Sequence, residues 1–418
     1  MKQARFFIAL AMVHFVIGVT LGGMMAVDTS LWGTLVPVHA EINPFGWLTM
    51  LIYGMTYAVL ASFGRFRPLS AVAGWTHLLC AEIGVAAIAL GAGFSLNVLV
   101  EAGWVFQALA PLLFLRNIMW IVRSRQSVAE RPTGVNSESA QDGSSASGLL
   151  TPAVYAESTD RIAQRGTSLA LLCWIIAAVW MAADVLATAG AGAANLPTGA
   201  LVLVYYGWIA GTVLSVSLHL FPRFVGRKCV GRRQGSLIQT LWIAGVAIAA
   251  IAPDPGRAAG RLGFALIGVS LLWIASLYVW QMRRDWFKRL GVTSGVAWIA
   301  SWCFALALGV RLVWGADPLS LVSLHLLFLG WITTLVYGVG YTLFPRVLHR
   351  YVRSGWVSPT QMAASISGAV LMPIGFSLMA RGLVAGLNVL AVGGVFAGLG
   401  ALSFIVIWSA SKREGGVA

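Results

Sequence analysis

The chain has 418 residues, of which 59% are hydrophobic and only 10% are charged. Apolar runs of this kind exclude a water-soluble globular protein and predict an all-α integral membrane protein in contact with lipid. The 28 Lys and Arg residues exceed the 14 Asp and Glu residues, but they lie in short loops between apolar runs, which argues against nucleic acid as a partner. The four cysteines are far apart and no CxxCH motif occurs, which argues against a disulfide framework and covalent c-type haem.

About twelve stretches are apolar and long enough to cross a bilayer, at roughly 20 residues each. The first six fall near residues 6–27, 33–62, 69–95, 103–122, 167–190 and 198–222. The last six fall near residues 236–253, 259–281, 293–314, 319–345, 359–380 and 385–410. Basic residues are concentrated in alternate loops, and by the positive-inside rule this places both termini in the cytoplasm. We expect the membrane to be a bacterial inner membrane.

A polar segment at residues 126–165 separates the first four spans from the remaining eight. It is rich in Ser, Ala, Gly and Glu, a composition typical of a disordered linker. We therefore predict a single membrane domain, residues 1–418, with four spans in 1–125, a cytoplasmic linker at 126–165 and eight spans in 166–418.

An internal repeat relates spans two, six and ten. GWLTMLIYGMTY (46–57) and GWITTLVYGVGY (330–341) share Gly, Trp, Thr, Tyr, Gly and Tyr at identical offsets. The sixth span carries the same Gly-Trp pair at 207–208 and ends in LHLFPR, where the tenth ends in YTLFPR. Because the pattern recurs every four helices, it predicts three four-helix units arranged about a pseudo-threefold axis.

Two histidines lie at matching depths in the related spans two and ten. His39 is a few residues inside the outer end of span two, and His325 is equally far inside the outer end of span ten. An imidazole within a bilayer is costly and is a functional candidate, although a histidine bonded to a neighbouring carbonyl is the usual structural alternative. Two neutral imidazoles at one depth are what axial ligation of one haem iron requires.

The residues around both histidines resemble subunit I of the haem-copper oxidases, especially the cbb-type and nitric-oxide-reductase-like branches. PVHAEINPFGW (37–47) is similar to the second-span haem segment of that family, and SLHLLFLGW (323–331) is similar to its tenth-span HxHxxxxGW segment. The resemblance implies a pseudo-threefold, twelve-span fold in which His39 and His325 bind one low-spin haem b.

The chain also departs from the family pattern. Ser323 stands where the family has the histidine that binds the high-spin haem, and spans six and seven lack the histidines that bind copper at their matching positions. Residues two apart on a helix differ by about 200°, so Ser323 and His325 face opposite sides. The resemblance therefore implies one haem, no copper and no oxygen-reducing centre.

Four arginines lie on the outer side, against the positive-inside bias. They are Arg257, Arg261, Arg311 and Arg381. A guanidinium forms bidentate, charge-assisted bonds to carboxylates, so Arg381 first, on the resemblance, and Arg311 after it are candidate partners of haem propionates. Lipid phosphate is the alternative partner for these side chains.

Five further residues are ionisable and fall within spans. His14, His77 and His219 each lie about two turns from the cytoplasmic end of a span, so they are candidates for a second cofactor site or for structural hydrogen bonds. Glu41 and Glu82 are candidates for proton relay or quinol contact. For Glu41 the alternative is a carboxyl that reaches outward to the interface.

These expectations describe a b-type cytochrome-like membrane protein that transfers electrons or senses a ligand. It would act as a redox subunit of an oxidoreductase complex and would not reduce oxygen by itself. Its partner would be quinol, a periplasmic electron carrier or another membrane redox subunit. The alternative is a metal- or haem-handling transporter or assembly factor of the NnrS type, in which the histidines hold metal or haem in transit.

Overall fold

The computed structural model describes residues 2–62, 69–124, 157–188, 196–282, 290–348 and 355–413, together with residues 287, 350 and 351. Within these residues, 12 helical segments are long and apolar enough to cross a membrane. This confirms the prediction of an all-helical, polytopic integral membrane protein. The segments are Lys2–Val27, Thr29–Ala61, Ala71–Phe94, Asn97–Arg123, Thr159–Ala187, Thr198–Val225, Arg232–Ile251, Ala258–Gln281, Val292–Val313, Leu321–Phe344, Val357–Met379 and Ala385–Ser409.

The elements follow one another in three similar series. The first is α1 (Lys2–Val27), η1 (Thr29–Leu31), α2 (Trp32–Glu41), η2 (Ile42–Thr49), α3 (Met50–Ser62), α4 (Ala71–Phe94) and α5 (Asn97–Arg123). The second is α7 (Glu157–Ala187), α8 (Thr198–Val202), η5 (Leu203–Ala210), α9 (Gly211–Val225), α10 (Arg232–Ile251) and α11 (Ala258–Gln281). The third is α13 (Val292–Val313), α14 (Leu321–His325), η6 (Leu326–Thr333), α15 (Thr334–Leu348), α16 (Val357–Met379) and α17 (Ala385–Ser409). Two short strands, β1 (Arg350–Tyr351) and β2 (Lys412–Arg413), pair antiparallel.

The Gly-Trp segments of the repeat share an unusual backbone conformation. Each lies in an eight-residue π-helix, namely η2, η5 and η6, in the middle of an otherwise α-helical span. π-Helices are rare and are found disproportionately at functional sites. The recurrence of this conformation at the three sequence-related positions supports treating them as equivalent places in the fold.

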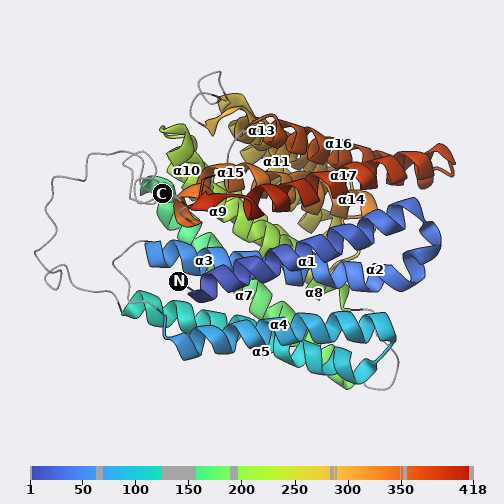
Figure 1. Cartoon of the computed structure of the whole chain (residues 1–418), viewed down its shortest axis with the longest axis horizontal. Helices are drawn as coiled ribbons and strands as arrows, with labels where there is room; N and C mark the ends of the chain where they lie inside the picture. Colours follow the sequence, from blue (N-terminus) through green and yellow to red (C-terminus); the bar gives the residue numbers. More distant parts are fainter. Residues whose placement is uncertain are drawn as a thin grey trace, which may run out of the picture.

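The contacts between helices also recur along the chain. α1 packs on η2, α7 on η5 and α13 on η6, while α5 contacts α7, α11 contacts α13 and α17 contacts α1. The last helix of each series thus packs on the first helix of the next, and α17 closes the arrangement by lying along α1 (Figure 1). α1 begins and α17 ends at the same end of the bundle, as an even number of spans requires.

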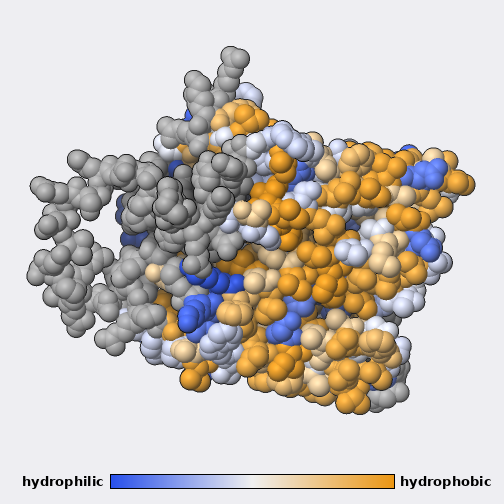
Figure 2. All heavy atoms as spheres, viewed as in Figure 1, coloured by the Kyte–Doolittle hydropathy of each residue, from blue (hydrophilic) through white to orange (hydrophobic). Residues whose placement is uncertain are grey.

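The outer surface of the bundle is apolar. Figure 2 shows hydrophobic residues over much of the visible face of the described helices. Large side chains such as Leu79, Val98 and Trp280 are 57%, 75% and 86% exposed. An exposed apolar surface of this extent marks contact with lipid or with other membrane proteins.

Polar caps define the turns that lead into spans two and ten. At the start of η1, the Asp28 carboxylate accepts hydrogen bonds from the Ser30 backbone N–H and hydroxyl at 2.9 and 2.7 Å, and these bonds lower the pKa of that carboxyl below its usual value. At the start of α14, the Ser320 hydroxyl accepts a bond from the Ser323 N–H. These caps determine where the two histidine-bearing helices begin.

The predicted linker at 126–165 needs a correction at its end. Its last residues, 157–165, are helical, because α7 begins at Glu157 instead of near residue 167. Glu157 and Asp160 in the first turn complement the positive end of the helix dipole, and Asp160 also forms an ion pair with α9. Residues 126–156 lie outside the described part of the chain.

Candidate functional site

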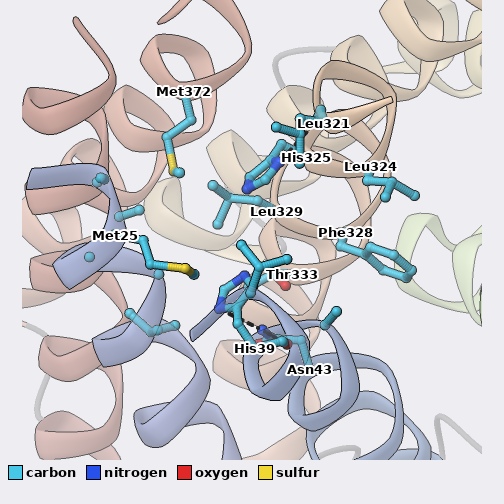
Figure 3. A pocket seen from close by; sticks show the side chains of 18 of the residues that line it. Met25, His39, Asn43, Leu321, Leu324, His325, Phe328, Leu329, Thr333 and Met372 are labelled. Carbon is cyan, nitrogen blue, oxygen red and sulfur yellow. Dashed lines mark hydrogen bonds between the residues drawn. The ribbon is translucent and has the colours of Figure 1, made fainter. Parts of the chain in front are cut away.

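A mostly apolar pocket lies between the first and third series of helices. Its walls come from α1, α2, η2, α14, η6, α16 and α17, with Tyr205 of η5 from the second series, and its volume is about 210 Å³. His39 and His325 both line it and approach it from different helices (Figure 3). The structure therefore brings together the two histidines that the sequence predicts to share a ligand.

Hydrogen bonds and a close helix contact hold the His39 ring. Its Nδ1 lies 2.8 Å from the backbone oxygen of Gly18 in α1. The Asn43 side-chain amide donates to the backbone oxygen of His39 at 2.8 Å. A Cβ atom at Gly22 would lie only 2.8 Å from Cε1 of His39, so the ring occupies space that exists because residue 22 has no side chain. α1 thus determines where the imidazole lies.

The His325 ring is held by its own helix and by α16. Its Nδ1 lies 2.7 Å from the backbone oxygen of Leu321, one turn earlier in α14. The ring also packs against Phe376, with centroids 4.7 Å apart. His39 is close enough to interact electrostatically with it.

The Nδ1 contacts favour one tautomer of both rings. Because a carbonyl oxygen only accepts hydrogen bonds, the contacts at 2.8 and 2.7 Å favour a proton on Nδ1 and a lone pair on Nε2 of each neutral ring. At His39 this contact is shorter than the 3.2 Å between Nδ1 and the Asn43 amide nitrogen, which would donate to Nδ1 in the other tautomer. Among the described residues, neither Nε2 has a hydrogen-bond partner. A metal-binding histidine commonly donates its other N–H to a carbonyl in this way. The donor set therefore fits a haem iron or another metal ion bound between the two rings.

Two methionine side chains also line the pocket. The thioether sulfurs of Met25 in α1 and Met372 in α16 point into the same space as the imidazoles (Figure 3). The sequence reasoning missed both residues, because a methionine in a membrane span has no distinguishing pattern. Asn43 and Gly22 were also missed, although Asn43 follows His39 by one turn and Gly22 follows Gly18 by one turn.

Ser323 lies on the opposite side of α14 from the pocket. It is fully buried, and its hydroxyl donates to the Asp317 backbone oxygen at 2.7 Å. The Arg311 guanidinium donates to the same hydroxyl through Nε at 3.4 Å. Ser323 therefore has its own polar partners and does not line the pocket that contains His39 and His325, which we call the histidine pocket.

Neither candidate propionate partner lines the pocket. Arg311 points toward Ser323, and Arg381 is exposed in the turn between α16 and α17. Arg257 forms a solvent-exposed ion pair with Asp254 at 3.4 Å. A propionate role for Arg381 or Arg311 stays a prediction, and it would require the propionates to extend beyond the pocket walls.

Glu41 lies next to the pocket, behind one of its walls. One of its carboxyl oxygens is buried and has no hydrogen-bond partner among the described residues. The group interacts electrostatically with Tyr205 of η5, and Tyr205 lines the pocket. The buried oxygen and the interaction with Tyr205 indicate that the Glu41 carboxyl lies near the second series of helices.

The other three membrane histidines lie in separate polar contacts. Nε2 of His14 is 3.1 Å from both carboxyl oxygens of Glu82. Nδ1 of His77 is 2.9 Å from the Tyr57 hydroxyl, and His219 bonds to Asp160. Within the described ranges, no group of three or more His, Cys, Asp and Glu residues is arranged to hold a metal ion. Each of the three histidines has a different partner, so the described residues do not bring them together into one site.

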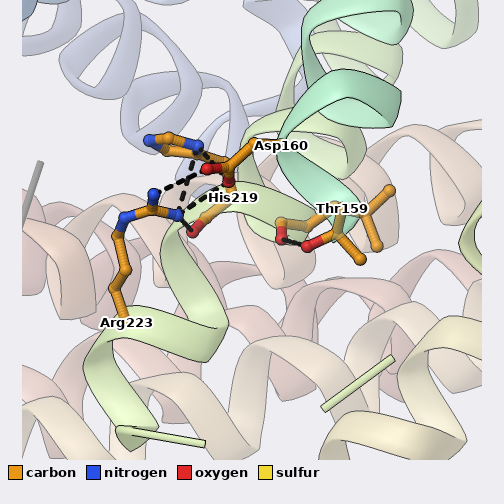
Figure 4. A network of polar contacts seen from close by, with 5 residues as sticks. Thr159, Asp160, His219 and Arg223 are labelled. Carbon is orange, nitrogen blue, oxygen red and sulfur yellow. Dashed lines mark hydrogen bonds and ion pairs between the residues drawn. The ribbon is translucent and has the colours of Figure 1, made fainter. Parts of the chain in front are cut away.

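Within the second series of helices, a charged cluster links α7 to α9 (Figure 4). The Arg223 guanidinium donates to both Asp160 carboxylate oxygens at 2.8 and 2.7 Å. His219 Nδ1 lies 2.8 Å from the same carboxylate, and the Thr159 hydroxyl donates to the Leu218 backbone oxygen at 3.1 Å. The Arg223 side chain is only 2% exposed, so this cluster compensates a buried positive charge.

Asp160→Asn should destabilise the protein without changing the histidine pocket. The substitution leaves the buried Arg223 charge without its carboxylate, and breaking a buried ion pair costs about 3 kcal/mol or more. Thermal denaturation of the purified protein in detergent measures the loss. Asp254→Asn is the matched control, because its pair with Arg257 is exposed and such pairs contribute only ~0–1 kcal/mol. Equal stability of the two variants would show that the cluster is not structural.

No protein-family model matches the chain, and no curated protein does.

Proposed function

We propose that this membrane protein is a b-type cytochrome-like protein that binds one low-spin haem b, with His39 and His325 as axial ligands. The observation that carries the proposal is that both imidazoles reach one apolar pocket with Nδ1 bonded to a carbonyl and Nε2 left as a ligand. The apolar lining suits a porphyrin, and the absence of a side chain at Gly22 leaves room for the His39 imidazole. The sequence resemblance to oxidase subunit I supports the same pair of ligands.

The recurring π-helices and helix contacts support the wider architecture in this proposal. We take the chain as three four-helix units about a pseudo-threefold axis, with η2, η5 and η6 at equivalent places. The haem pocket would lie between units one and three. Both termini would be cytoplasmic, in a bacterial inner membrane.

A haem held by two histidines would supply one-electron transfer. Because His39 and His325 would both hold the iron, the haem would not bind oxygen, and Ser323 on the other side of α14 offers no second haem ligand. The protein would therefore pass electrons, or sense a ligand that displaces one histidine. Its partner would be quinol, a periplasmic electron carrier or a redox subunit.

The second candidate function is metal or haem handling, as in a transporter or assembly factor of the NnrS type. Met25 and Met372 favour it, because two thioethers and two imidazoles form a donor set suited to a soft ion such as Cu(I). In this function the pocket would hold its cargo temporarily, and the apolar face of the bundle would contact a partner subunit.

Quantification of haem and copper separates the two functions. The cytochrome function predicts about one haem per chain in the pyridine haemochrome assay and much less than one copper. Substituting both Met25 and Met372 with leucine should leave the haem content unchanged. Stoichiometric copper that is lost in the double variant would contradict the cytochrome proposal and favour the metal-handling one.

A further inference from the structure

The His14–Glu82 pair lies within the membrane spans and does not line the histidine pocket, although Phe15, the next residue of α1, does. Nε2 of His14 is 3.1 Å from both Glu82 oxygens. His14 is twelve residues into α1 and Glu82 is eleven residues into α4, so at 1.5 Å per residue each is about 17–18 Å along its helix. With a hydrocarbon core roughly 30 Å thick, this places the pair inside the core, where ionisable groups are costly.

Packing does not require a histidine at this position. A Cβ atom at Gly46 of η2 would lie 2.7 Å from His14. At the equivalent glycines of η5 and η6, a Cβ atom would lie 2.8 Å from Cys173 and 2.8 Å from Phe304. The first helix of each series thus presents a different side chain to the same glycine, and a thiol or a phenyl ring fills that space as well as an imidazole does.

The contact itself requires a proton. A carboxylate and an unprotonated nitrogen both only accept hydrogen bonds, so at 3.1 Å either the imidazole or the carboxyl must carry hydrogen. With one proton on Nε2 the pair has a charge of −1, and with a second proton it is neutral. The second form is favoured in a membrane, because it leaves no net buried charge.

We propose that His14 and Glu82 form a proton-binding site within the membrane, which takes up and releases one proton. The His14 side chain is 8% exposed, whereas the Glu82 side chain is 27% exposed. The Glu82 carboxyl therefore reaches the outer surface of the helix bundle, where a membrane-soluble reagent can contact it. The second nitrogen of His14, Nδ1, is buried and has no hydrogen-bond partner among the described residues, so it is available as an acceptor.

The elements packed on α1 and α4 bring few other ionisable groups to the pair. η2 and α17 contain none. Gln107 of α5, which is neutral, donates to the Ala81 backbone oxygen at 3.2 Å. The ionisable residues of α2, α3 and α5 are His39, Glu41, Tyr53, Tyr57, Glu101, Arg116 and Arg123. None of these bonds to either member of the pair in the described structure, so the proton is held by two groups alone.

The site is one helical turn along α1 from the pocket. Gly18, whose backbone oxygen bonds to His39, follows His14 by four residues. A proton bound at the pair is therefore placed to offset negative charge that arrives in the pocket. The proton site itself does not depend on what the pocket binds, and its test needs no haem.

A hydrophobic carbodiimide tests the site, because it enters membranes and reacts with protonated carboxyls. The carboxyl O–H adds across a C=N bond, oxygen to carbon and hydrogen to nitrogen, and acyl migration to nitrogen gives a stable N-acylurea without loss of atoms. Purified protein in lipid vesicles would be labelled with dicyclohexylcarbodiimide over a range of pH, and the Glu82 peptide quantified by mass spectrometry. We expect Glu82 to be labelled, with a yield that rises as pH falls, and Glu82→Gln to lose the label.

His14→Phe is the decisive variant, because Phe304 shows that this fold accepts a phenyl ring at the equivalent place. The substitution removes the only described hydrogen-bond partner of the Glu82 carboxyl, which should make its protonated, reactive form more abundant. Labelling near neutral pH should then rise by roughly tenfold, as expected for the loss of one partner that favours the carboxylate. An unlabelled Glu82 in both proteins, or identical pH profiles, would overturn the proposal.

Discussion

Replacement of either His39 or His325 with alanine should remove the low-spin haem signal. With one imidazole and four porphyrin nitrogens the iron would have only five ligands, so the sharp α-band of a six-coordinate haem would be lost. The optical spectrum of the dithionite-reduced protein measures the change. His39 and His325 both line the pocket, and each variant removes one of the two proposed ligands. The two variants should therefore have the same phenotype.

Two controls separate loss of a ligand from loss of the fold. Added imidazole should enter the space left by either alanine and restore the low-spin band, which a misfolded protein cannot do. Ser323→Ala should keep the band, because Ser323 bonds to Asp317 and Arg311 on the other side of α14. Normal spectra in both histidine variants would remove the ligand assignment.

Gly22→Ala should have the second largest effect on the pocket. A methyl group at residue 22 would lie 2.8 Å from Cε1 of His39, so the ring or α1 must move. Overpacking of this kind typically costs ~1–3 kcal/mol, and 1.4 kcal/mol corresponds to about tenfold in an equilibrium constant. We expect haem affinity to fall by about tenfold or more, with a broadened α-band.

The adjacent glycine provides a matched control for this prediction. A Cβ atom at Gly23 would have only the Gly394 backbone oxygen nearby, at 4.0 Å, so alanine fits there. Gly23→Ala adds the same methyl group to another pocket-lining position of the same helix without meeting the His39 ring, so it should lower haem affinity much less than Gly22→Ala. If the two variants bind haem equally well, the Gly22 contact does not position His39.

The class of fold could be predicted from the sequence because membrane spans follow directly from hydropathy. Long apolar runs have no alternative to crossing the bilayer as helices, and each predicted span overlaps a helical segment of the structure. Helix ends were less predictable. α7 begins at Glu157, within the predicted linker, because Thr159 and Asp160 bond to α9 over a long sequence separation.

That His39 and His325 lie close together was also predictable, because both are near the outer ends of repeat-related spans, and both line one pocket. Their tautomer was not, because it depends on the Gly18 and Leu321 carbonyls, and backbone acceptors leave no trace in a sequence. The partners of His14 and His219 likewise come from other helices. Side chains that meet only through tertiary packing cannot be paired from hydropathy or spacing.

The reduced-minus-oxidised optical spectrum of the purified wild-type protein tests the central claim most directly. With His39 and His325 as the two axial ligands, the spectrum should show a single sharp α-band of low-spin b-type haem. Carbon monoxide should leave this band unchanged, because neither axial position is open. A colourless preparation, or a reduced haem that binds carbon monoxide fully, would contradict the assignment of both histidines to one haem.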